Sequence, residues 1–377
     1  MTRILLAPDK FKGSLSAADV ARALASGMLS VDSSLETVCL PVADGGDGTV
    51  DAAVTAGWDR MAVTCSGPTG EKVNTSYARR GDTAVVELAS AVGLELLPDG
   101  RPDALGASTF GLGTVIADAL EAGAERIVVG LGGSASTDGG AGMLSALGAR
   151  ILDADGNDVA LGGGALRGAV HLDLSGILPS ARNAVFELAC DVDNPLLGAT
   201  GAAAVYGPQK GAGPQELLYL EHGMRQWAHL VRNAIGRDVS GLAGTGAAGG
   251  TAFGAIAVLG AAAKPGIETV LELIDFGSAL ASADLVVTGE GSLDEQSLHG
   301  KAPIGVAHAA RAAGVPVITV AGRSVVGLDR LRPYGITASY ALADLEPDPR
   351  ISMRDAARLL HEVGRTLATT HILEGTS

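Results

Sequence analysis

Aromatic residues and cysteines are scarce in this chain of 377 residues. Phe, Trp and Tyr together make up only 3% of it, although 47% is hydrophobic. A packed core is therefore available, but Ala, Val, Leu and Ile have to build it. The three cysteines, Cys39, Cys65 and Cys190, stand far apart and include no C-x-x-C pair. This spacing argues against a disulfide framework and predicts a reducing, cytoplasmic location.

Long hydrophobic runs and several common catalytic motifs are missing as well. No apolar run approaches the roughly 18 residues of a membrane span without a glycine-rich or charged break, and the first residues resemble a strand more than a signal peptide. The sequence also lacks H-x-x-x-H, G-x-S-x-G and G-x-x-x-x-G-K-[ST]. We therefore expect no membrane association, no zinc site, no α/β-hydrolase and no P-loop enzyme.

Positive charge is in short supply, and lysine especially so. The formal net charge is −15, which argues against a broad nucleic-acid or anionic-membrane surface. There are only six lysines, and four of them, Lys10, Lys12, Lys210 and Lys301, lie in glycine- or serine-rich stretches. A compact ammonium suits a phosphate oxygen at a crowded position, so these four are candidates for neutralising phosphate. The alternative for each one alone is a solvated surface lysine.

Glycine is abundant, at 54 residues, and it is clustered. One cluster, with six glycines in fifteen residues, is VVGLGGSASTDGGAG at Val128–Gly142, which joins a predicted strand to a predicted helix. Exposed backbone N–H groups in such a turn can bind an anion, and this predicts phosphate contacts from Gly132, Gly133 and Ser134. A tight turn capped by Ser or Thr is the alternative explanation.

Strand and helix patterns alternate at both ends of the chain, whereas the middle contains short strands separated by turns. We predict an α/β fold of two domains. A Rossmann-like parallel sheet built from both chain ends occupies residues 1–60 and 280–377, and an inserted mixed-sheet domain occupies residues 61–279. The main predicted strands are Arg3–Ala7, Thr37–Val42, Met61–Cys65, Val73–Ala78, Ala84–Leu88, Arg126–Gly130, Val185–Cys190, Asp284–Thr288 and Pro316–Ala321, and three of the predicted helices are Pro214–Ile235, Ala252–Ala263 and Ser352–Thr369.

Charged residues follow most of the predicted parallel strands. The carboxyl ends of such strands meet at one edge of a sheet, where ligands bind. Carboxylates there can hold Mg²⁺ or accept a proton from a hydroxyl nucleophile, although each one alone could be a turn-former, and Asp294 could simply cap a helical turn. The residues beyond the strand ends are Asp9, Lys10, Lys12, Ser14, Asp44, Asp47, Asp191, Asp193, Asn194, Glu290, Asp294 and Lys301.

Six stretches, in order, resemble the blocks of the glycerate kinase type-1 family. They are APDKFKGSLSA, PVADGGDGTVDA, GLGGSASTDGGAGML, CDVDNPLLG, VYGPQKGA and VVTGEGSLDEQSLHGKAPIGVA, which lie between about residue 3 and residue 323. The resemblance implies two α/β domains with the site between them. It also implies ATP- and Mg²⁺-dependent phosphorylation of D-glycerate, with 2-phosphoglycerate the usual bacterial product, in organic acid and glyoxylate degradation. Compared with many relatives, this chain has Lys10 in place of Ser and Ser292 in place of Arg or Lys.

On this basis each site residue has an expected role. Gly132, Gly133, Ser134 and either Lys210 or Lys301 would bind the phosphates of the nucleotide, and Asp191 and Glu290 would hold the metal. Asp44 or Asp47 is the candidate base. Lys12 with Ser14 would hold the substrate carboxylate or the γ-phosphate, with Lys10, Asn194 and Asp294 as further substrate contacts. Which lysine serves which anion stays open, as does assembly into a homodimer.

Two other functions are compatible with parts of the sequence. Gly130-x-Gly132-x-x-Ala135 follows a predicted strand, and Asp153 lies after the next one, which is similar to the dinucleotide fingerprint of an NAD(P)-dependent hydroxy-acid dehydrogenase. That function leaves the lysine and carboxylate loops unexplained. A non-catalytic anion-binding protein would not need the carboxylates at all.

Overall fold

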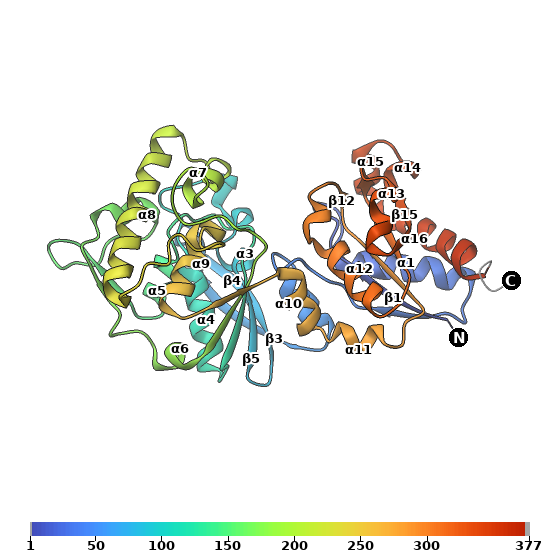
Figure 1. Cartoon of the computed structure of the whole chain (residues 1–377), viewed down its shortest axis with the longest axis horizontal. Helices are drawn as coiled ribbons and strands as arrows, with labels where there is room; N and C mark the ends of the chain where they lie inside the picture. Colours follow the sequence, from blue (N-terminus) through green and yellow to red (C-terminus); the bar gives the residue numbers. More distant parts are fainter. Residues whose placement is uncertain (1, 374–377) are drawn as a thin grey trace. The chain divides into compact units, whose positions relative to one another are not determined.

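The computed structural model describes residues 2–373, which form two compact units (Figure 1). Within the described residues, the first unit comprises 2–44, 51–57 and 267–373, and the second comprises 45–50 and 58–266. The first contains an all-parallel sheet and the second a mixed sheet. The predicted α/β class, with a parallel sheet and a separate mixed sheet, is confirmed.

The first unit is built on a parallel five-stranded sheet made from both chain ends. Its order is β15 (Ile336–Ala341), β13 (Val317–Ala321), β11 (Leu285–Gly289), β1 (Arg3–Pro8) and β2 (Glu36–Cys39). The chain therefore adds β2 on one side of β1 and the remaining strands on the other. Between β1 and β11 the strand order reverses, and in open α/β sheets ligands bind beyond the carboxyl ends of the strands at such a point.

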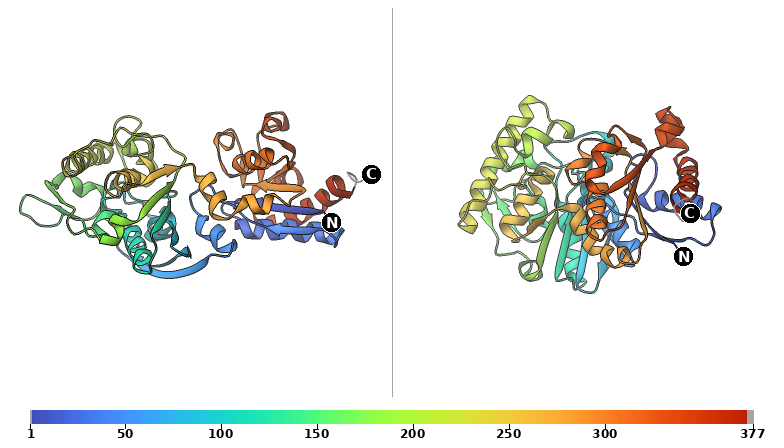
Figure 2. Two further views of the ribbon diagram at one scale, coloured as in Figure 1. Left: turned by 60° about the horizontal axis from the view of Figure 1, so that its bottom comes forward. Right: turned by 45° about the vertical axis from the view of Figure 1, so that its right-hand side comes forward.

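Both faces of this sheet are covered by helices, as the ribbon views show (Figure 2). Ile4 and Leu6 of β1 pack with α1 (Ala17–Val31) and α16 (Ala356–Leu367). Leu5 and Ala7, which point the other way, pack with helices of the opposite layer such as α12 (Ala302–Ala312). Alternate residues of a strand point to opposite faces, so a strand buried on both sides has to be apolar in its buried part, as Ile4–Ala7 is.

The second unit contains a six-stranded mixed sheet in which one strand runs opposite to the other five. The order is β10 (Ala262–Lys264), β9 (Val185–Ala189), β6 (Arg126–Gly130), β5 (Thr83–Glu87), β4 (Lys72–Arg80) and β3 (Asp59–Ser66). The first four strands are parallel, whereas β4 pairs antiparallel with both β5 and β3. This confirms the hairpins predicted in the middle of the chain. The core of this unit is closed by α4 (Phe110–Glu121), α5 (Ala141–Ala146), α8 (Pro214–Ile235) and α9 (Ala247–Val258).

Two of the predicted helices differ from those of the structure: one ends earlier and the other is interrupted. The helix predicted for Ala252–Ala263 ends at Val258, and Ala262–Lys264 instead pairs with β9. Alanine is common in the whole segment, so no change of period marks the boundary. The helix predicted for Ser352–Thr369 is divided into α15 (Pro349–Arg354) and α16, because Asp355 has a non-helical ψ of 14°.

The other elements are short or cover the two sheets. Within residues 2–373, no helix has both the length and the apolar character needed to cross a membrane. The remaining helices and strands are α2 (Thr49–Thr55), α3 (Leu88–Val92), β7 (Arg150–Leu152), β8 (His171–Asp173), α6 (Pro179–Asn183), α7 (Ala202–Tyr206), α10 (Gly266–Leu273), α11 (Phe276–Leu280), β12 (Ser292–Leu293), β14 (Arg323–Ser324), α13 (Leu328–Leu331) and α14 (Leu342–Leu345).

Candidate functional site

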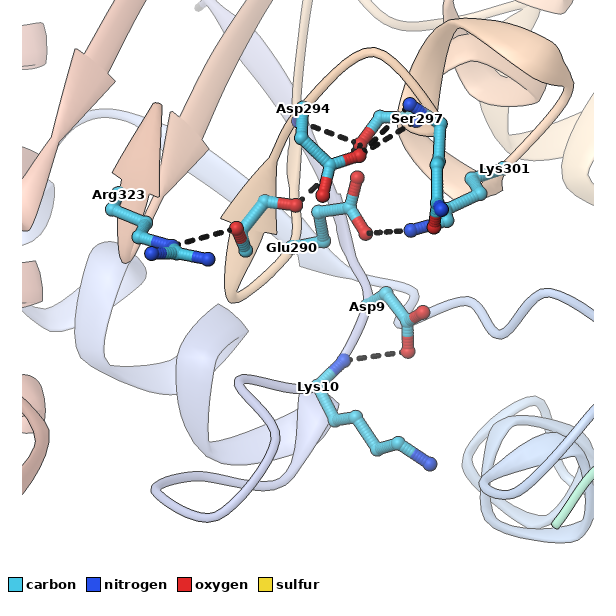
Figure 3. A network of polar contacts seen from close by, with 9 residues as sticks. Asp9, Lys10, Glu290, Asp294, Ser297, Lys301 and Arg323 are labelled. Carbon is cyan, nitrogen blue, oxygen red and sulfur yellow. Dashed lines mark hydrogen bonds and ion pairs between the residues drawn. The ribbon is translucent and has the colours of Figure 1, made fainter. Parts of the chain in front are cut away.

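Charged side chains gather in the first unit where β1 and β11 end. Asp9 follows β1 and Glu290 follows β11, and the Asp9 N–H donates to the carbonyl of Gly289 at 2.8 Å. The two loops therefore leave the sheet side by side. Figure 3 shows Asp9, Glu290 and Lys301 close together at this edge, while the Lys10 side chain extends away from the Asp9 carboxylate.

A cavity of about 700 Å³ opens at the same edge. Sites for cofactors and drug-sized ligands have volumes of about 300–1,000 Å³, so it is large enough for a nucleotide. One part of its wall is charged, and another part is formed by α14, α15 and the start of α16. It brings together these residues predicted from the sequence: Lys10, Lys12, Ser14, Asp44, Glu290, Asp294 and Lys301.

Glu290 is the most enclosed carboxylate of the cavity, with 9% of its surface exposed. Its Oε2 lies 3.9 Å from Lys301 Nζ, whereas its Oε1 is buried and accepts no hydrogen bond among the described residues. Burial raises the pKa of Glu290, and the neighbouring Ser297 hydroxyl and Lys301 ammonium oppose that rise. A buried carboxylate oxygen without a partner is costly, so Oε1 is a natural ligand for a cation or a donor that enters the cavity.

Asp294 has a structural role in the loop that holds Glu290 in place. Its carboxylate accepts hydrogen bonds from the N–H groups of Gln296 and Ser297, at 2.9 and 3.2 Å. This is the turn-capping role that was its alternative explanation. Ser14 is likewise engaged, since its hydroxyl donates to the carbonyl of Met353 at 2.6 Å. The hydroxyl proton of Ser14 is therefore already used within the protein.

Asp9 directly follows β1, but the sequence reasoning assigned it no role. Burial and the negative charge of Asp44 raise its pKa to about 8, against the opposing hydrogen bond from the Lys10 N–H. That bond joins Lys10 N to Asp9 Oδ1 at 2.6 Å. The Asp9 carboxyl is therefore neutral near pH 7 until a cation or another positive group enters the cavity.

We expect Asp9→Asn to change how stability depends on pH. The pKa of Asp9 is about 8 in the folded protein and near 3.8 in an ordinary environment. Between these values the folded chain binds one proton more than the unfolded chain, so stability falls as the pH rises through this window. Asn cannot lose a proton. The melting temperature of the wild type should therefore decline relative to that of Asp9→Asn as the pH is raised from about 4 to about 8.

A matched control for this comparison is Asp329→Asn, at an exposed carboxylate of the same unit that is paired with Arg332. Its melting curve should follow the wild type across the window. If Asp9→Asn also runs parallel to the wild type, the pKa of Asp9 is not raised in the folded protein.

Arg323 is a cavity residue that the sequence reasoning missed. It follows β13 and lines the cavity, and its Nε donates to Ser292 Oγ at 2.9 Å (Figure 3). The signal was present in the sequence, because Arg323 stands just beyond the end of a predicted parallel strand. Ser292 itself carries no charge, but its hydroxyl oxygen accepts a hydrogen bond from the Arg323 guanidinium and orients it at the cavity.

The glycine-rich loop of the second unit is organised around a buried carboxyl group, that of Asp138, whose pKa is raised by burial against the hydrogen bonds that it accepts. Its carboxylate is fully buried and accepts hydrogen bonds from the Thr109 N–H and hydroxyl, both at 2.8 Å, and from the N–H groups of Gly140 and Gly142, both at 3.2 Å. Gly140 and Gly142 stand at the start of α5. The N–H groups at this helix start are thus used by a carboxyl group of the protein itself.

Lys210 also serves this loop from inside. It is 2% exposed, and its Nζ donates to Ser134 Oγ at 3.0 Å and to the carbonyl of Ser136. Burial lowers the pKa of Lys210 to about 7, and the negative charge of Asp138 opposes the shift. Ser134 is itself 5% exposed. Both side chains therefore hold the loop in its conformation, and contact with a nucleotide phosphate stays a prediction for them.

The glycines of this loop allow other parts of the second unit to approach closely. A Cβ on Gly132 would lie 2.8 Å from Gly46 Cα, and one on Gly139 would lie 2.5 Å from Trp227 Cδ1. Real Cβ atoms are almost never found so close to another atom. Internal packing is therefore enough to explain these glycines. Phosphate binding by Gly132 and Gly133 stays a prediction.

The other predicted residues of the second unit lie at the ends of its elements. Asp47 neighbours the buried Glu87, whose pKa is raised to about 7 mainly by burial. Asp191 Oδ1 accepts from the Gly266 N–H at 2.8 Å. Asn194 uses both ends of its amide, since Nδ2 donates to the Thr200 carbonyl at 2.9 Å and Oδ1 accepts from the Tyr206 hydroxyl at 2.6 Å. Their catalytic, metal and substrate roles stay predictions.

The residues of the cavity are compatible with a magnesium ion. No three His, Cys, Asp or Glu side chains within residues 2–373 form a ready-made metal site. Mg²⁺ does not need one, because it is usually held by one or two carboxylates together with substrate phosphates and water. The unpartnered Oε1 of Glu290 fits that requirement.

The segment that resembles a dinucleotide fingerprint does not have the strand–turn–helix structure of that motif. In that motif the glycines lead directly from a strand into a helix, whose N-terminus binds the pyrophosphate. Here the segment from Leu131 to Gly140 separates β6 from α5, and Asp138 already occupies the start of the helix. The geometry gives no support to a dehydrogenase.

Comparisons with known proteins agree along the whole chain. A glycerate kinase from Halalkalibacterium halodurans is 42% identical over 376 residues, with 98% of each chain covered. A glycerate 2-kinase from Escherichia coli is 44% identical over 344 residues, with 90% of each covered. A crystal structure from Salmonella typhimurium LT2 that carries the name glycerate kinase 2 superposes with a TM-score of 0.86 at 40% identity, covering 100% of both chains. The model of the glycerate kinase family matches residues 4–372, and this chain belongs to that family.

Proposed function

We propose that this protein is an ATP- and Mg²⁺-dependent kinase that phosphorylates D-glycerate at its 2-hydroxyl. The observation that carries the proposal is the match over nearly the full length to proteins named glycerate kinase, one of which is named glycerate 2-kinase. The nucleotide-sized cavity at the switch point of the parallel sheet, with cations and carboxylates in its wall, supports the same function.

In this reaction the glycerate hydroxyl oxygen attacks the γ-phosphorus, the bond to the β–γ bridging oxygen breaks, and the hydroxyl proton passes to a carboxylate. Such transfers need mainly positioning and neutralisation of charge. Lys12 and Lys301 line the cavity and are our candidates for binding phosphate or carboxylate oxygens, and Asp44 is the candidate acceptor of the proton. Mg²⁺ would neutralise phosphate oxygens, and Glu290 of the first unit and Asp191 of the second are the two residues predicted to hold it.

The experiment that tests this function is ³¹P NMR of the product formed from ATP, Mg²⁺ and D-glycerate. We expect a phosphomonoester resonance that coincides with that of added 2-phosphoglycerate, and none of it when glycerate is omitted. Growth of the 3-phosphoglycerate signal instead would correct the regiochemistry. If no phosphomonoester forms while a nicotinamide cofactor is reduced in the presence of glycerate, the protein is a dehydrogenase and the proposal fails.

A further inference from the structure

The cavity of the first unit has an apolar wall for which a small hydroxy acid has no use. This wall is formed mainly by apolar residues from α14 to the start of α16, with Glu346 and Ser352 as its polar members; the apolar ones are Leu342, Ala343, Pro347, Pro349, Met353 and Ala356. Met353 lines the cavity with 47% of its surface exposed. Covering this apolar surface with a ligand would be favourable, because it removes the surface from water. Glycerate is compact and polar, so it would leave most of this wall uncovered.

The charged part of the cavity suits a polyanion that carries a divalent cation. Lys10, Lys12, Lys301 and Arg323 contribute four cationic side chains, and Asp9, Asp44, Glu290 and Asp294 contribute carboxyl groups beside them, which is the mixture that a metal-bound phosphate chain requires. The cationic side chains come from the segments that follow β1, η5 (Ser297–His299) and β13, which meet at the carboxyl edge of the sheet. A ligand that matches the whole cavity therefore has an apolar planar or ring portion at one end and several negative charges at the other.

The two parts of the cavity are held together within the unit. The Ser14 hydroxyl ties the loop after β1 to the Met353 carbonyl at 2.6 Å, and the Ala343 N–H donates to the Gly322 carbonyl at 3.0 Å, next to Arg323. Asp348 caps α15 by accepting from the N–H groups of Arg350 and Ile351. The apolar wall is therefore in place before a ligand arrives, as is usual for cofactor sites.

From this arrangement we infer that the cavity of the first unit binds the nucleoside triphosphate, with the base against the wall around Leu342, Pro347 and Met353 and the phosphates toward Lys12, Lys301 and Arg323. This inference rests on the proposed function for the identity of the nucleotide. The position agrees with the general rule that mononucleotides bind beyond the carboxyl edge at the switch point of such sheets. It assigns the nucleotide to the first unit, independently of the glycine-rich loop of the second.

Nucleotide binding to the full chain tests the inference without requiring catalysis. ADP and inorganic tripolyphosphate are titrated separately by calorimetry into the wild type and into Met353→Glu, which puts a charge into the apolar wall. We expect ADP to bind Met353→Glu about tenfold or more weakly, since an apolar contact of the base is lost and a charge is desolvated. Tripolyphosphate has no base, so its affinity should change much less.

The matched control is Leu345→Glu, at a residue of α14 that is 51% exposed and is not among the cavity residues. It should bind ADP as the wild type does. Since Met353 and Leu345 are both exposed, folding is checked by circular dichroism and is expected to be unchanged. Unchanged ADP affinity in folded Met353→Glu overturns the inference, as does an equal loss for ADP and tripolyphosphate. Failure of the proposed function would instead leave the wild type without glycerate phosphorylation, whatever its affinity for ADP.

Discussion

Glu290→Gln is expected to lower kcat for glycerate phosphorylation by about 100-fold, the order of magnitude lost when one group that stabilises charge is removed from an active site. Glu290 Oε1 is buried in the cavity and has no partner among the described residues. The amide of Gln has nearly the same shape but no charge, so it binds Mg²⁺ poorly and places a donor where an acceptor stood. The Mg²⁺ concentration that gives half-maximal rate should rise along with the fall in kcat.

A matched control lies on the same loop. Glu295 is exposed and pairs with Arg330 at the surface, and it is not a cavity residue. Glu295→Gln should keep the kcat and the Mg²⁺ dependence of the wild type. If Glu290→Gln also shows wild-type values of both, Glu290 neither binds the metal nor faces the transferred phosphate. A fall in kcat with unchanged Mg²⁺ dependence would point to contact with the substrate and would exclude the metal role.

The sequence alone predicted the α/β class and the loops that surround the cavity. Both predictions come from local signals. An apolar run such as Ile4–Ala7 indicates a buried parallel strand. Ligands bind beyond the carboxyl ends of such strands, so the loops that follow them are the candidates for the site. Lys10, Glu290 and Lys301 were found in this way and line the cavity. Applied one strand further, the same rule would have found Arg323.

The rest depends on contacts between distant positions. Thr109 lies 29 residues before its partner Asp138, and Lys210 lies 76 residues after its partner Ser134. No local pattern in the sequence therefore shows that Thr109 and Lys210 hold the glycine-rich loop from inside the unit. Glycine was ambiguous for a related reason. Only the folded chain shows that Gly132 makes room for Gly46 and Gly139 for Trp227. The apolar wall of the cavity was missed because Leu, Pro and Met in short helices and the turns between them carry no functional signal.

Loss of the buried carboxyl group at position 138 should strongly destabilise the second unit. We expect Asp138→Ala to lower the free energy of unfolding by about 3–5 kcal/mol, because it leaves several buried donors without an acceptor and each such donor costs about 1–3 kcal/mol. The Thr109 N–H and hydroxyl and the N–H groups of Gly140 and Gly142 would lose their acceptor inside the core. Lys210 would lose the neighbouring negative charge that opposes the fall of its pKa.

The measurement is denaturant unfolding followed by tryptophan fluorescence, because both tryptophans, Trp58 and Trp227, belong to the second unit. Asp153→Ala is the control: Asp153 also accepts two backbone hydrogen bonds, from Asp155 and Asn157, but in a surface turn. Water can replace it there, so we expect a loss of only about 1 kcal/mol. An equal loss from the two substitutions would show that Asp138 is no more than another turn-former. A larger loss for Asp138→Ala would show that this acid organises the glycine-rich loop from within.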